Sequence, residues 1–380
     1  MSEPAPPAAS PPPDPLAAGV LLVVEQLRRQ VPGGIGTYAN GLLHGLAELS
    51  GRDRPMLRLH ASREVGRRDP LEAYGLPVHA SPLPSPLLVR AWDLGLARIG
   101  KGAALVHSVS LATPASAPPL VVTVHDVAWR SVPEAYPRRG QRWHEAALRR
   151  TAKRADAVVV PSRQVAEELA DAGVGLGEER VTVIEEGADH LPRPDLDAAG
   201  LVLGRLGVTG EFLLSVGTLE PRKNLRRLFA AYGAARPRLA EPWPLVVVGP
   251  PGWGESSGRP PEGVVFAGRL GDAALAGLYA LARGLAYVPL KEGFGLPVVE
   301  AMRLGTPVVA SPVPSAAGAA LEVDPYDVDS IADGLVAVAG DETLRRRLSE
   351  DGQARAAVLT WRATAAAHVA LWRRVAASRG

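Results

Sequence analysis

Short, continuous apolar runs rich in valine recur along this chain, and they constrain its fold more than any other feature of the sequence. They alternate with longer segments in which Ala, Leu and Arg follow helical spacing. Strands that are apolar on both faces are typical of parallel sheets covered by helices. The pattern therefore predicts an α/β fold of the doubly wound class. We expect strands at residues 19–25, 56–62, 104–110, 120–126, 156–162, 180–187, 212–218, 244–250, 263–268, 284–290 and 306–311.

The length of 380 residues predicts two domains, because one domain usually holds about 100–200 residues. A stretch containing Pro and Asp at residues 190–200 divides the expected strands into two sheets of similar size. We assign residues 19–195 to an N-terminal domain, 196–360 to a C-terminal domain, and 361–380 to a final helix that packs back on the N-terminal domain. Ligands of such sheets bind beyond the carboxyl ends of the strands, so we expect the site in a cleft between two facing sheets.

Residues 1–18 hold seven prolines, five alanines and no basic residue, a composition that predicts a disordered tail. The apolar run at 16–24 follows Glu3 and Asp14 without a Lys or Arg, so we interpret it as the first strand rather than a signal peptide. The stretch from 102 to 124 carries no charge, but its prolines predict strand, loop and strand. No transmembrane helix is expected.

The composition excludes several classes of function. The absence of cysteine removes disulfides, thiolate metal sites and cysteine nucleophiles, and it predicts a cytoplasmic location. The 42 Lys and Arg residues nearly balance the 40 Asp and Glu residues, so we expect no nucleic-acid partner. Helix capping explains the D-x-D pattern of Asp327 and Asp329, and no His spacing is of the zinc type, so we expect no metal.

The strongest motif spans residues 289–311, where a strand, a Gly-Phe-Gly loop, a helix and a second strand are predicted to follow one another. Pro297 suits the first helical turn, and a glycine ends the helix. The backbone N–H groups of Phe294, Gly295 and Leu296 would point into the cleft from the positive end of the helix. This arrangement suits polyhydroxylated or anionic ligands.

Two carboxylates flank the start of this helix. Glu292 lies on the loop and Glu300 lies one turn inside the helix, and each carboxylate can accept a pair of hydrogen bonds from hydroxyl groups. The alternative makes Glu292 a surface charge and Glu300 a favourable acid near the helix start. The complete strand, loop, helix and strand arrangement favours the binding interpretation.

A second motif places two cations, Arg222 and Lys223, between a strand end and a helix. Cations near a helix N-terminus oppose the macrodipole, and Lys223 is one of only four lysines in the chain. This unfavourable placement indicates a bound anion, for which a diphosphate is a natural candidate. The alternative is a solvated charge pair.

Two further motifs follow predicted strands of the N-terminal half. The glycine loop at 32–38 places Gly33 and Gly34 where backbone amides could approach a phosphate, although its distance from the strand argues against a dinucleotide fold. His125 and Asp126 follow a buried strand and aim at the same cleft edge. A lone histidine is more often structural, but its place at a strand end favours contact with a polar ligand.

The helix predicted from Arg138 to Ala155 carries a basic stripe. This stripe has two interpretations. It is either a solvated surface or a site of contact with anionic lipid or a phosphate-bearing acceptor. The stripe consists of Arg138, Arg142, Arg149 and Lys153, with Arg139 and Arg150 beside it.

Taken together, these motifs resemble the retaining glycosyltransferases of family 4, which have the GT-B fold of two facing Rossmann-like domains. They occur in the family's order and cover most of the chain, and the E-x7-E block from Glu292 to Glu300 is the specific one. The matching segments are GGIGTY at 33–38, VTVHD at 122–126, RADAVVVPS at 154–162, VIEEGADH at 183–190, VGTLEPRKN at 216–224, LVVVGPPGW at 245–253 and the block at 292–300.

The resemblance implies a donor site for a nucleoside diphosphate sugar in the C-terminal domain. Glu300 would hold the ribose hydroxyls, while Glu292 and the backbone of residues 294–296 would contact the donor sugar and distal phosphate. Arg222 and Lys223 would neutralise the diphosphate. No cofactor or metal is then needed.

Across the cleft, the resemblance implies that amides of Gly33 and Gly34 join the diphosphate site, that His125 touches the sugar, and that Asp126 lies on the acceptor side. The implied reaction moves a hexosyl or deoxyhexosyl group, with a mannosyl type favoured, to an acceptor hydroxyl with retention. A glycan or lipid-linked acceptor in envelope polysaccharide or glycolipid synthesis fits a peripheral site on the inner face of the plasma membrane.

The sequence departs from the family pattern at two places. A shorter stretch at 312–320 replaces the usual Ser-Leu-Pro-Glu segment, and Glu185 and Glu186 replace Pro-Asn in the V-I-P-N-G motif. Two other functions stay open. One is a GT-B enzyme of the sugar-nucleotide 2-epimerase type, and the other is a non-catalytic nucleotide-sugar-binding subunit.

Overall fold

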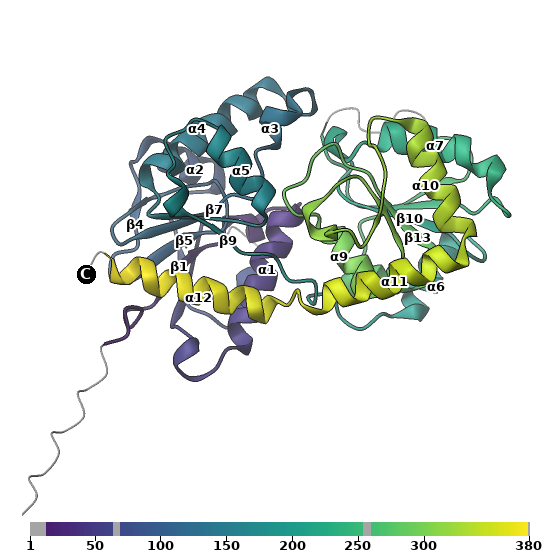
Figure 1. Cartoon of the computed structure of the whole chain (residues 1–380). Helices are drawn as coiled ribbons and strands as arrows, with labels where there is room; N and C mark the ends of the chain where they lie inside the picture. The colour runs from purple at the N-terminus through teal and green to yellow at the C-terminus, as the bar shows by residue number, and fades with distance from the viewer. Residues whose placement is uncertain (1–12, 64–68, 254–259, 379–380) are drawn as a thin grey trace, which may run out of the picture.

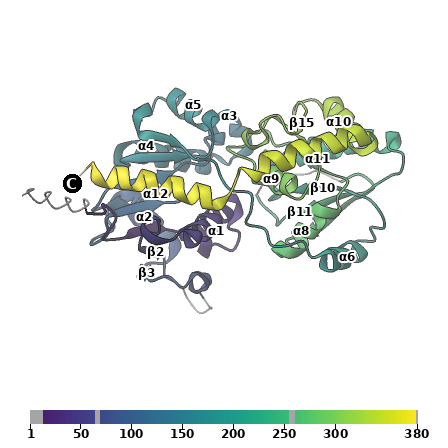
Figure 2. The same cartoon turned by 60° about the horizontal axis from the view of Figure 1, so that its bottom comes forward.

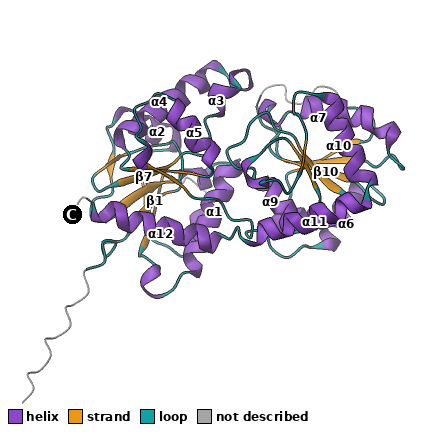
Figure 3. Cartoon of the chain, in the orientation of Figure 1, coloured by secondary structure: helices purple, strands orange, loops and turns teal. Residues whose placement is uncertain are grey.

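The computed structural model describes residues 13–63, 69–253 and 260–378. These residues form two domains side by side, each a parallel sheet with helices on both faces (Figures 1 and 3). The prediction of a doubly wound α/β fold is confirmed.

The N-terminal domain contains a seven-stranded sheet of order β3-β2-β1-β5-β7-β8-β9, in which every pairing is parallel. The strand order reverses between β1 and β5, which is where open α/β sheets bind ligands. The strands are β1 (Val20–Val23), β2 (Leu57–Ala61), β3 (Val78–Ala80), β5 (Leu105–Ser108), β7 (Leu120–Thr123), β8 (Ala157–Val160) and β9 (Val181–Val183). The helices are α1 (Gly33–Glu48), α2 (Ser85–Leu94), α3 (Ala128–Ser131), α4 (Arg138–Arg154) and α5 (Arg163–Asp171), and a small separate sheet pairs β4 (Arg98–Ile99) with β6 (Ala115–Ser116).

The C-terminal domain repeats this design with a six-stranded parallel sheet of order β12-β11-β10-β13-β14-β15. Its strands are β10 (Leu213–Val216), β11 (Leu245–Val248), β12 (Val264–Gly268), β13 (Gly284–Tyr287), β14 (Val308–Ala310) and β15 (Leu321–Glu322). Its helices are α6 (Leu196–Arg205), α7 (Leu225–Ala235), α8 (Asp272–Leu281), α9 (Leu296–Arg303), α10 (Val328–Gly340) and α11 (Glu342–Ala357).

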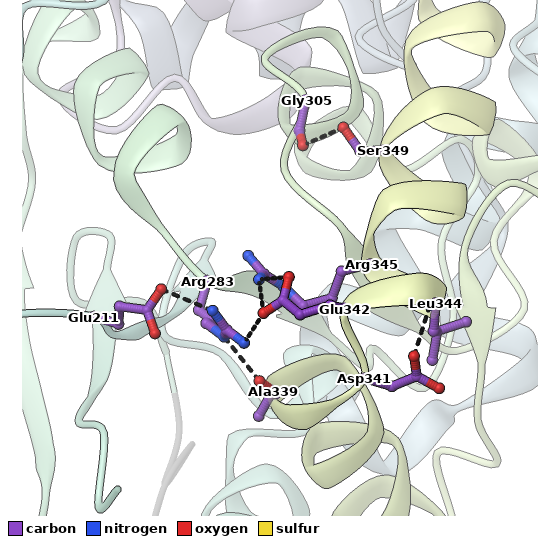
Figure 4. Close-up of polar contacts among 9 residues, drawn as sticks. All are labelled: Glu211, Arg283, Gly305, Ala339, Asp341, Glu342, Leu344, Arg345 and Ser349. Carbon is purple, nitrogen blue, oxygen red and sulfur yellow. Dashed lines mark hydrogen bonds and ion pairs between the residues drawn. The ribbon is translucent and has the colours of Figure 1, made fainter. Parts of the chain in front are cut away.

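Polar contacts attach α11 to the C-terminal domain (Figure 4). Arg283, just before β13, donates to the carbonyl of Ala339 at the end of α10 and to Glu211, each at 2.8 Å, and also pairs with Glu342 at the start of α11. Further along, the Ser349 hydroxyl donates to the carbonyl of Gly305 at 2.8 Å. These bonds fix the helix that leads the chain back to the other domain.

The chain crosses between the domains twice, after β9 and again after α11, and the two crossing segments bond to each other. The Ala188 N–H donates to the carbonyl of Leu359 at 3.0 Å, and the Trp361 N–H donates to the carboxylate of Asp189 at 2.8 Å. Helix α12 (Trp361–Ala377) then runs along α1 of the N-terminal domain (Figure 2). The hinge is therefore a pair of bonded segments rather than a single linker.

Close packing of α12 on α1 depends on glycine. A Cβ added at Gly45 would lie 2.0 Å from the carbonyl oxygen of Trp361, whereas one added at Gly200 in α6 would meet nothing within 4 Å. We expect Gly45→Ala to lower the free energy of unfolding by more than about 2 kcal/mol through overpacking. Gly200→Ala should raise it by roughly 0.5–1 kcal/mol, as in an open helix. Urea unfolding of both variants checks this, and equal effects would contradict it.

The N-terminal boundary differs from the prediction. Residues 1–12 of the expected disordered tail lie outside the described residues. Residues 13–18, however, form a turn in which Leu16 is 2% exposed and belongs to the core of the first domain. An ordered segment therefore begins before residue 19, because Leu16 adds an apolar side chain to the sheet-helix interface.

A buried polar cluster lies between the N-terminal sheet and α12. The Tyr38 hydroxyl bonds to His368 Nε2 at 2.8 Å and to the Thr123 hydroxyl at 3.0 Å, and His107 bonds to Thr123 at 2.8 Å. His368 Nδ1 donates to the carbonyl of Thr364 at 2.7 Å. Burial lowers the pKa of His368 to about 4 and also lowers that of His107. Both rings are therefore neutral in the folded protein at pH 7.

This cluster predicts a loss of stability in acid. Because the folded-state pKa of His368 is depressed below the unfolded value of 6.5, its stabilising contribution is complete above pH 6.5 and falls as the pH drops towards 4. We expect a loss of about 3 kcal/mol from this residue over that interval. Urea unfolding across the interval should show a shallower pH dependence for His368→Gln than for the exposed control His79→Gln. Identical slopes would contradict the assignment.

Candidate active site

Three charged side chains meet at the carboxyl ends of β10 and β13. Glu292, in the loop between β13 and α9, pairs through Oε1 with Arg222 Nη1 at 2.8 Å and with the ammonium of Lys223. Lys223 also donates to the Tyr287 hydroxyl at 2.8 Å. Burial would raise the pKa of Glu292, but the two cations outweigh it and lower the pKa to about 2. The carboxylate is therefore ionised at all ordinary pH values.

The cations are held by the short 3₁₀ turn η6 (Pro221–Lys223), one turn before α7 rather than at its first residues. Arg222 pairs with the buried Glu220 at 2.8 Å as well as with Glu292. Asn224 fixes the turn by adopting a left-handed conformation, with φ of 60°, and by donating to the carbonyls of Val288 and Pro325. The anions that face the predicted cation pair in this structure are therefore two carboxylates of the chain itself.

The start of α9 presents unpaired donors. Gly295 has φ of +100°, a left-handed value that favours glycine, and it turns the chain into the helix. Ser315 binds the carbonyls of Phe294 and Gly295 at 3.0 Å each, and the Phe294 ring is buried. Among the described residues, no group accepts the N–H groups of Phe294, Gly295 and Leu296. They form an anion-binding arrangement beside Glu292.

Glu300 lies inside α9, 7% exposed, and both of its oxygens are bonded. The Tyr279 hydroxyl donates to Oε2 at 2.7 Å, and His190 Nε2 bonds to Oε1 at 3.0 Å. Burial and the adjacent carboxylate raise the pKa of Tyr279 well above its usual value. The carboxylate therefore keeps its orientation without a ligand.

His125 makes contacts that its predicted role does not require. Its Nε2 bonds to the carbonyl of Val109 at 2.9 Å and its Nδ1 to Glu186 at 3.3 Å. The Tyr38 ring packs edge-on against it, with the two ring centroids 4.7 Å apart. Burial lowers the pKa of His125, but Glu186 outweighs it and the net shift is upward. Asp126 accepts the N–H of Ala128 at 3.0 Å. Both ring nitrogens of His125 are thus engaged within the N-terminal domain.

The two domains touch where these loops face each other. A Cβ on Gly293 would lie 1.7 Å from the His125 carbonyl oxygen, so only glycine allows this approach. The Ser162 hydroxyl donates to the Gly293 carbonyl at 2.7 Å, and Trp253 Nε1 donates to the carbonyl of Ala135 at 3.1 Å. The His125 backbone and the Glu292 loop therefore form one continuous surface.

Gly33 and Gly34 begin α1 on the N-terminal side of this contact. Both are exposed, and nothing lies within 4 Å of a Cβ built on either. Gly33 has φ of +61°. The preceding loop reaches the other domain through Arg269, which donates to the carbonyl of Gln30 at 3.2 Å. The structure thus leaves room for a ligand at the start of α1 but gives the two glycines no contact with Arg222 or Lys223.

Five polar side chains of the site were not predicted from sequence. Tyr279 and Tyr287 lie within apolar segments, and Glu186 and His190 bond to partners 61 and 110 residues away along the chain. Glu220 lies two residues before its partner Arg222. Two signals were available: Glu220 lies near a strand end beside the predicted cations, and Glu186 replaces the asparagine of the family motif.

A separate groove of about 720 Å³ lies beside the crossing segments. It is lined by residues including Ser162, Glu185, Pro314 and Thr360. None of the predicted site residues lines it, so it is distinct from the donor site.

Comparison with known proteins places the chain in a family. The model described as Glycosyltransferase Family 4 matches residues 32–190, and the model described as Glycosyl transferases group 1 matches residues 205–355. The O-antigen chain mannosyltransferase B of Escherichia coli is 30% identical over 253 residues, which cover 63% of this chain and 66% of that protein. The serotype-specific mannosyltransferase WbdA of Escherichia coli is 30% identical over 235 residues, 58% of this chain but 28% of the relative.

Solved structures share the fold at lower identity. The Anabaena protein HepE, determined in complex with UDP and glucose, has a TM-score of 0.68 at 19% identity and covers 94% of this chain and 98% of its own. WaaG, described as a glycosyltransferase involved in lipopolysaccharide biosynthesis, has a TM-score of 0.65 at 15% identity, with coverage of 93% and 99%. Two parallel-sheet domains that face each other across charged loops are typical of the GT-B class. Within it, this chain belongs to glycosyltransferase family 4, as its motifs predicted.

Proposed function

We propose that this protein transfers a hexosyl group, of the mannosyl type, from a nucleoside diphosphate sugar to a hydroxyl of a glycan or lipid-linked acceptor in polysaccharide synthesis. The observation that carries the proposal is the convergence of Arg222 and Lys223 on Glu292, next to unpaired N–H groups at the start of α9. The mannosyltransferase relatives support the sugar class.

The proposed mechanism retains the configuration at the anomeric carbon. The bond between that carbon and the diphosphate oxygen breaks, and negative charge develops on the leaving group. Arg222, Lys223 and the N–H groups of α9 would stabilise this charge, a contribution of several kcal/mol in comparable sites. We assign this task to the two cations rather than to a divalent metal. The acceptor oxygen forms the new bond on the same face, and its proton passes to the departing phosphate oxygen.

A release assay with matched controls tests the proposal. The purified chain is incubated with UDP-, GDP-, ADP- and dTDP-linked sugars, with and without a panel of mannosyl acceptors, and free nucleoside diphosphate is measured. Transfer predicts release that depends on the acceptor. Release without an acceptor would favour the epimerase alternative, and binding without release under any condition would favour a non-catalytic subunit.

We also propose that one face of the N-terminal domain binds anionic membranes. On α4, Arg138, Arg142 and Lys153 are exposed, and neighbouring α2 exposes Leu87 and Leu94 at 57% and 55%. The two helices are joined by Arg150, which pairs with Asp93, and they lie side by side in Figure 1. Apolar side chains next to cations suit peripheral binding at a lipid surface. Among the described residues, no helix has both the length and the apolar character to cross a bilayer.

Vesicle sedimentation tests the membrane proposal. The protein is mixed with vesicles of phosphatidylcholine alone or with phosphatidylglycerol added. Binding is expected only with the anionic lipid, and a variant with Arg138→Glu and Arg142→Glu should remain in the supernatant. Charge reversal on the opposite domain, at Arg303, serves as the control. Equal sedimentation of all three proteins would contradict the proposal.

A further inference from the structure

The carboxylate of Glu300 is the centre of a buried chain of hydrogen bonds. The Trp361 indole N–H donates to His190 Nδ1 at 3.2 Å, His190 Nε2 bonds to Glu300 Oε1 at 3.0 Å, and the Tyr279 hydroxyl donates to Oε2 at 2.7 Å. All four side chains are almost completely shielded from solvent. The chain joins elements that lie far apart in sequence.

Chemistry fixes the direction of these bonds. An indole nitrogen can only donate, so Nδ1 of His190 must present a lone pair to Trp361. The ring proton therefore lies on Nε2 and is donated to Glu300. One protein donor then occupies each carboxylate oxygen, and each oxygen keeps a further acceptor position. Two fixed oxygens with one open position each match two adjacent hydroxyl groups of a ribose.

The donors come from different structural units. Tyr279 belongs to α8 of the C-terminal domain, whereas His190 and Trp361 lie on the two segments that cross between the domains. A carboxylate that only balanced charge within α9 would need neither contact. Its orientation instead depends on both crossing segments being in place.

We propose that His190, supported by Trp361, is a positioning residue that holds the Glu300 carboxylate ready for the ribose hydroxyls of the donor. This inference rests on the proposed function. It assigns to the hinge a part in donor recognition, because any movement of the crossing segments changes the direction of the His190 bond. His190 itself does not touch the donor.

The test measures how the 2′-hydroxyl of the ribose contributes to binding. Affinities of UDP, dUDP, GDP and dGDP are determined by calorimetry for the unsubstituted protein and for His190→Phe, His190→Gln, Trp361→Phe and Glu300→Ala. We expect the unsubstituted protein to prefer one ribonucleotide over its deoxy form by about tenfold or more, as for a hydrogen bond to a charged group. His190→Phe and Glu300→Ala should lose that preference while binding the deoxy form unchanged. Trp361→Phe should weaken the preference.

Two variants separate positioning from general damage. The glutamine amide can donate to Glu300 and accept from Trp361, so His190→Gln should restore the preference. His144→Phe removes a histidine that bonds to the carbonyl of Gly140 in the N-terminal domain, and it should leave the preference intact. In turnover, His190→Phe should raise KM for the donor and leave kcat nearly unchanged.

The outcomes distinguish this inference from the proposed function. A normal 2′-hydroxyl preference in His190→Phe, together with its loss in Glu300→Ala, would overturn the role of His190 alone. Weaker binding of ribo and deoxy forms alike in His190→Phe would show a merely structural role and would also overturn it. If the unsubstituted protein bound a ribonucleotide and its deoxy form equally well, the inference would fail while the proposed function would be unaffected.

Discussion

Arg222→Ala should lower kcat for glycosyl transfer by about 10³-fold, which is the size of effect seen when a donor to a developing oxyanion is removed. Arg222 is anchored by the buried Glu220, so its guanidinium stays in place when the donor displaces Glu292 and needs no further reorganisation as charge develops. The loss should appear mainly in kcat, because the interaction strengthens as the diphosphate departs. Lys223→Ala should act in the same direction. Initial rates at saturating donor give the measurement.

The control for this prediction lies four residues along the chain. Arg226→Ala removes a cation from the first turn of α7 that is exposed to solvent, and it should leave kcat unchanged. Circular dichroism and urea unfolding show whether Arg222→Ala remains folded. A folded Arg222→Ala protein with a normal kcat would remove the electrostatic part of the mechanism.

The sheets were predictable because their strands are buried on both faces. Every residue of β1 is buried, as is every residue of β5, β7, β8, β11 and β13, and each of these strands lies within a predicted apolar run. The edge strands β3 and β15 were missed. Val78–Ala80 and Leu321–Glu322 are short and partly exposed, so packing does not require the continuous apolar sequence that marks a central strand.

Part of the site was predictable from the same geometry. The carboxyl ends of β10 and β13, adjacent strands, must lie at one edge of the sheet, so the loops with Arg222 and Glu292 were expected near each other. The sequence does not predict the direct pairing of these residues, because each side chain suits a contact with a ligand. In the structure, the carboxylate of Glu292 pairs with both cations.

The partners of His125 and Glu300 could not be read from local sequence. Glu186 lies 61 residues from His125, and His190 lies 110 residues from Glu300. Both partners follow β9 on the first crossing segment. Glu186 bonds within the N-terminal domain, whereas His190 reaches Glu300 only when the two domains have packed. The substitution of the family asparagine by Glu186 marked the place, and in the structure the buried carboxylate bonds to His125 and raises the pKa of that ring.

Glu292→Gln should strengthen the binding of nucleoside diphosphate but slow glycosyl transfer. In the unliganded protein, the ionised Glu292 competes with an incoming diphosphate for Arg222 and Lys223. Because the pKa of Glu292 is lowered to about 2, the charge persists under all assay conditions, and only substitution removes it. We expect free nucleoside diphosphate to bind Glu292→Gln about tenfold more tightly, since charged hydrogen bonds no longer need to be broken. Transfer should nevertheless slow by about 10²-fold or more, because the carboxylate proposed to hold the donor sugar is lost.

The matched control for Glu292→Gln is Glu168→Gln. It breaks a similar ion pair, made by Lys291, the residue just before Glu292 in the same loop. Lys291 pairs with Glu168 of α5, so Glu168→Gln releases a cation that lies outside the proposed diphosphate site. Diphosphate affinity and kcat should both stay close to those of the unsubstituted protein. Calorimetry in low and high salt adds a second criterion, because the gain in affinity of Glu292→Gln is electrostatic and should shrink as salt screens it. Weaker diphosphate binding by Glu292→Gln would show that this carboxylate aids the anion site rather than competing with it, and the proposed arrangement of charges would then be wrong.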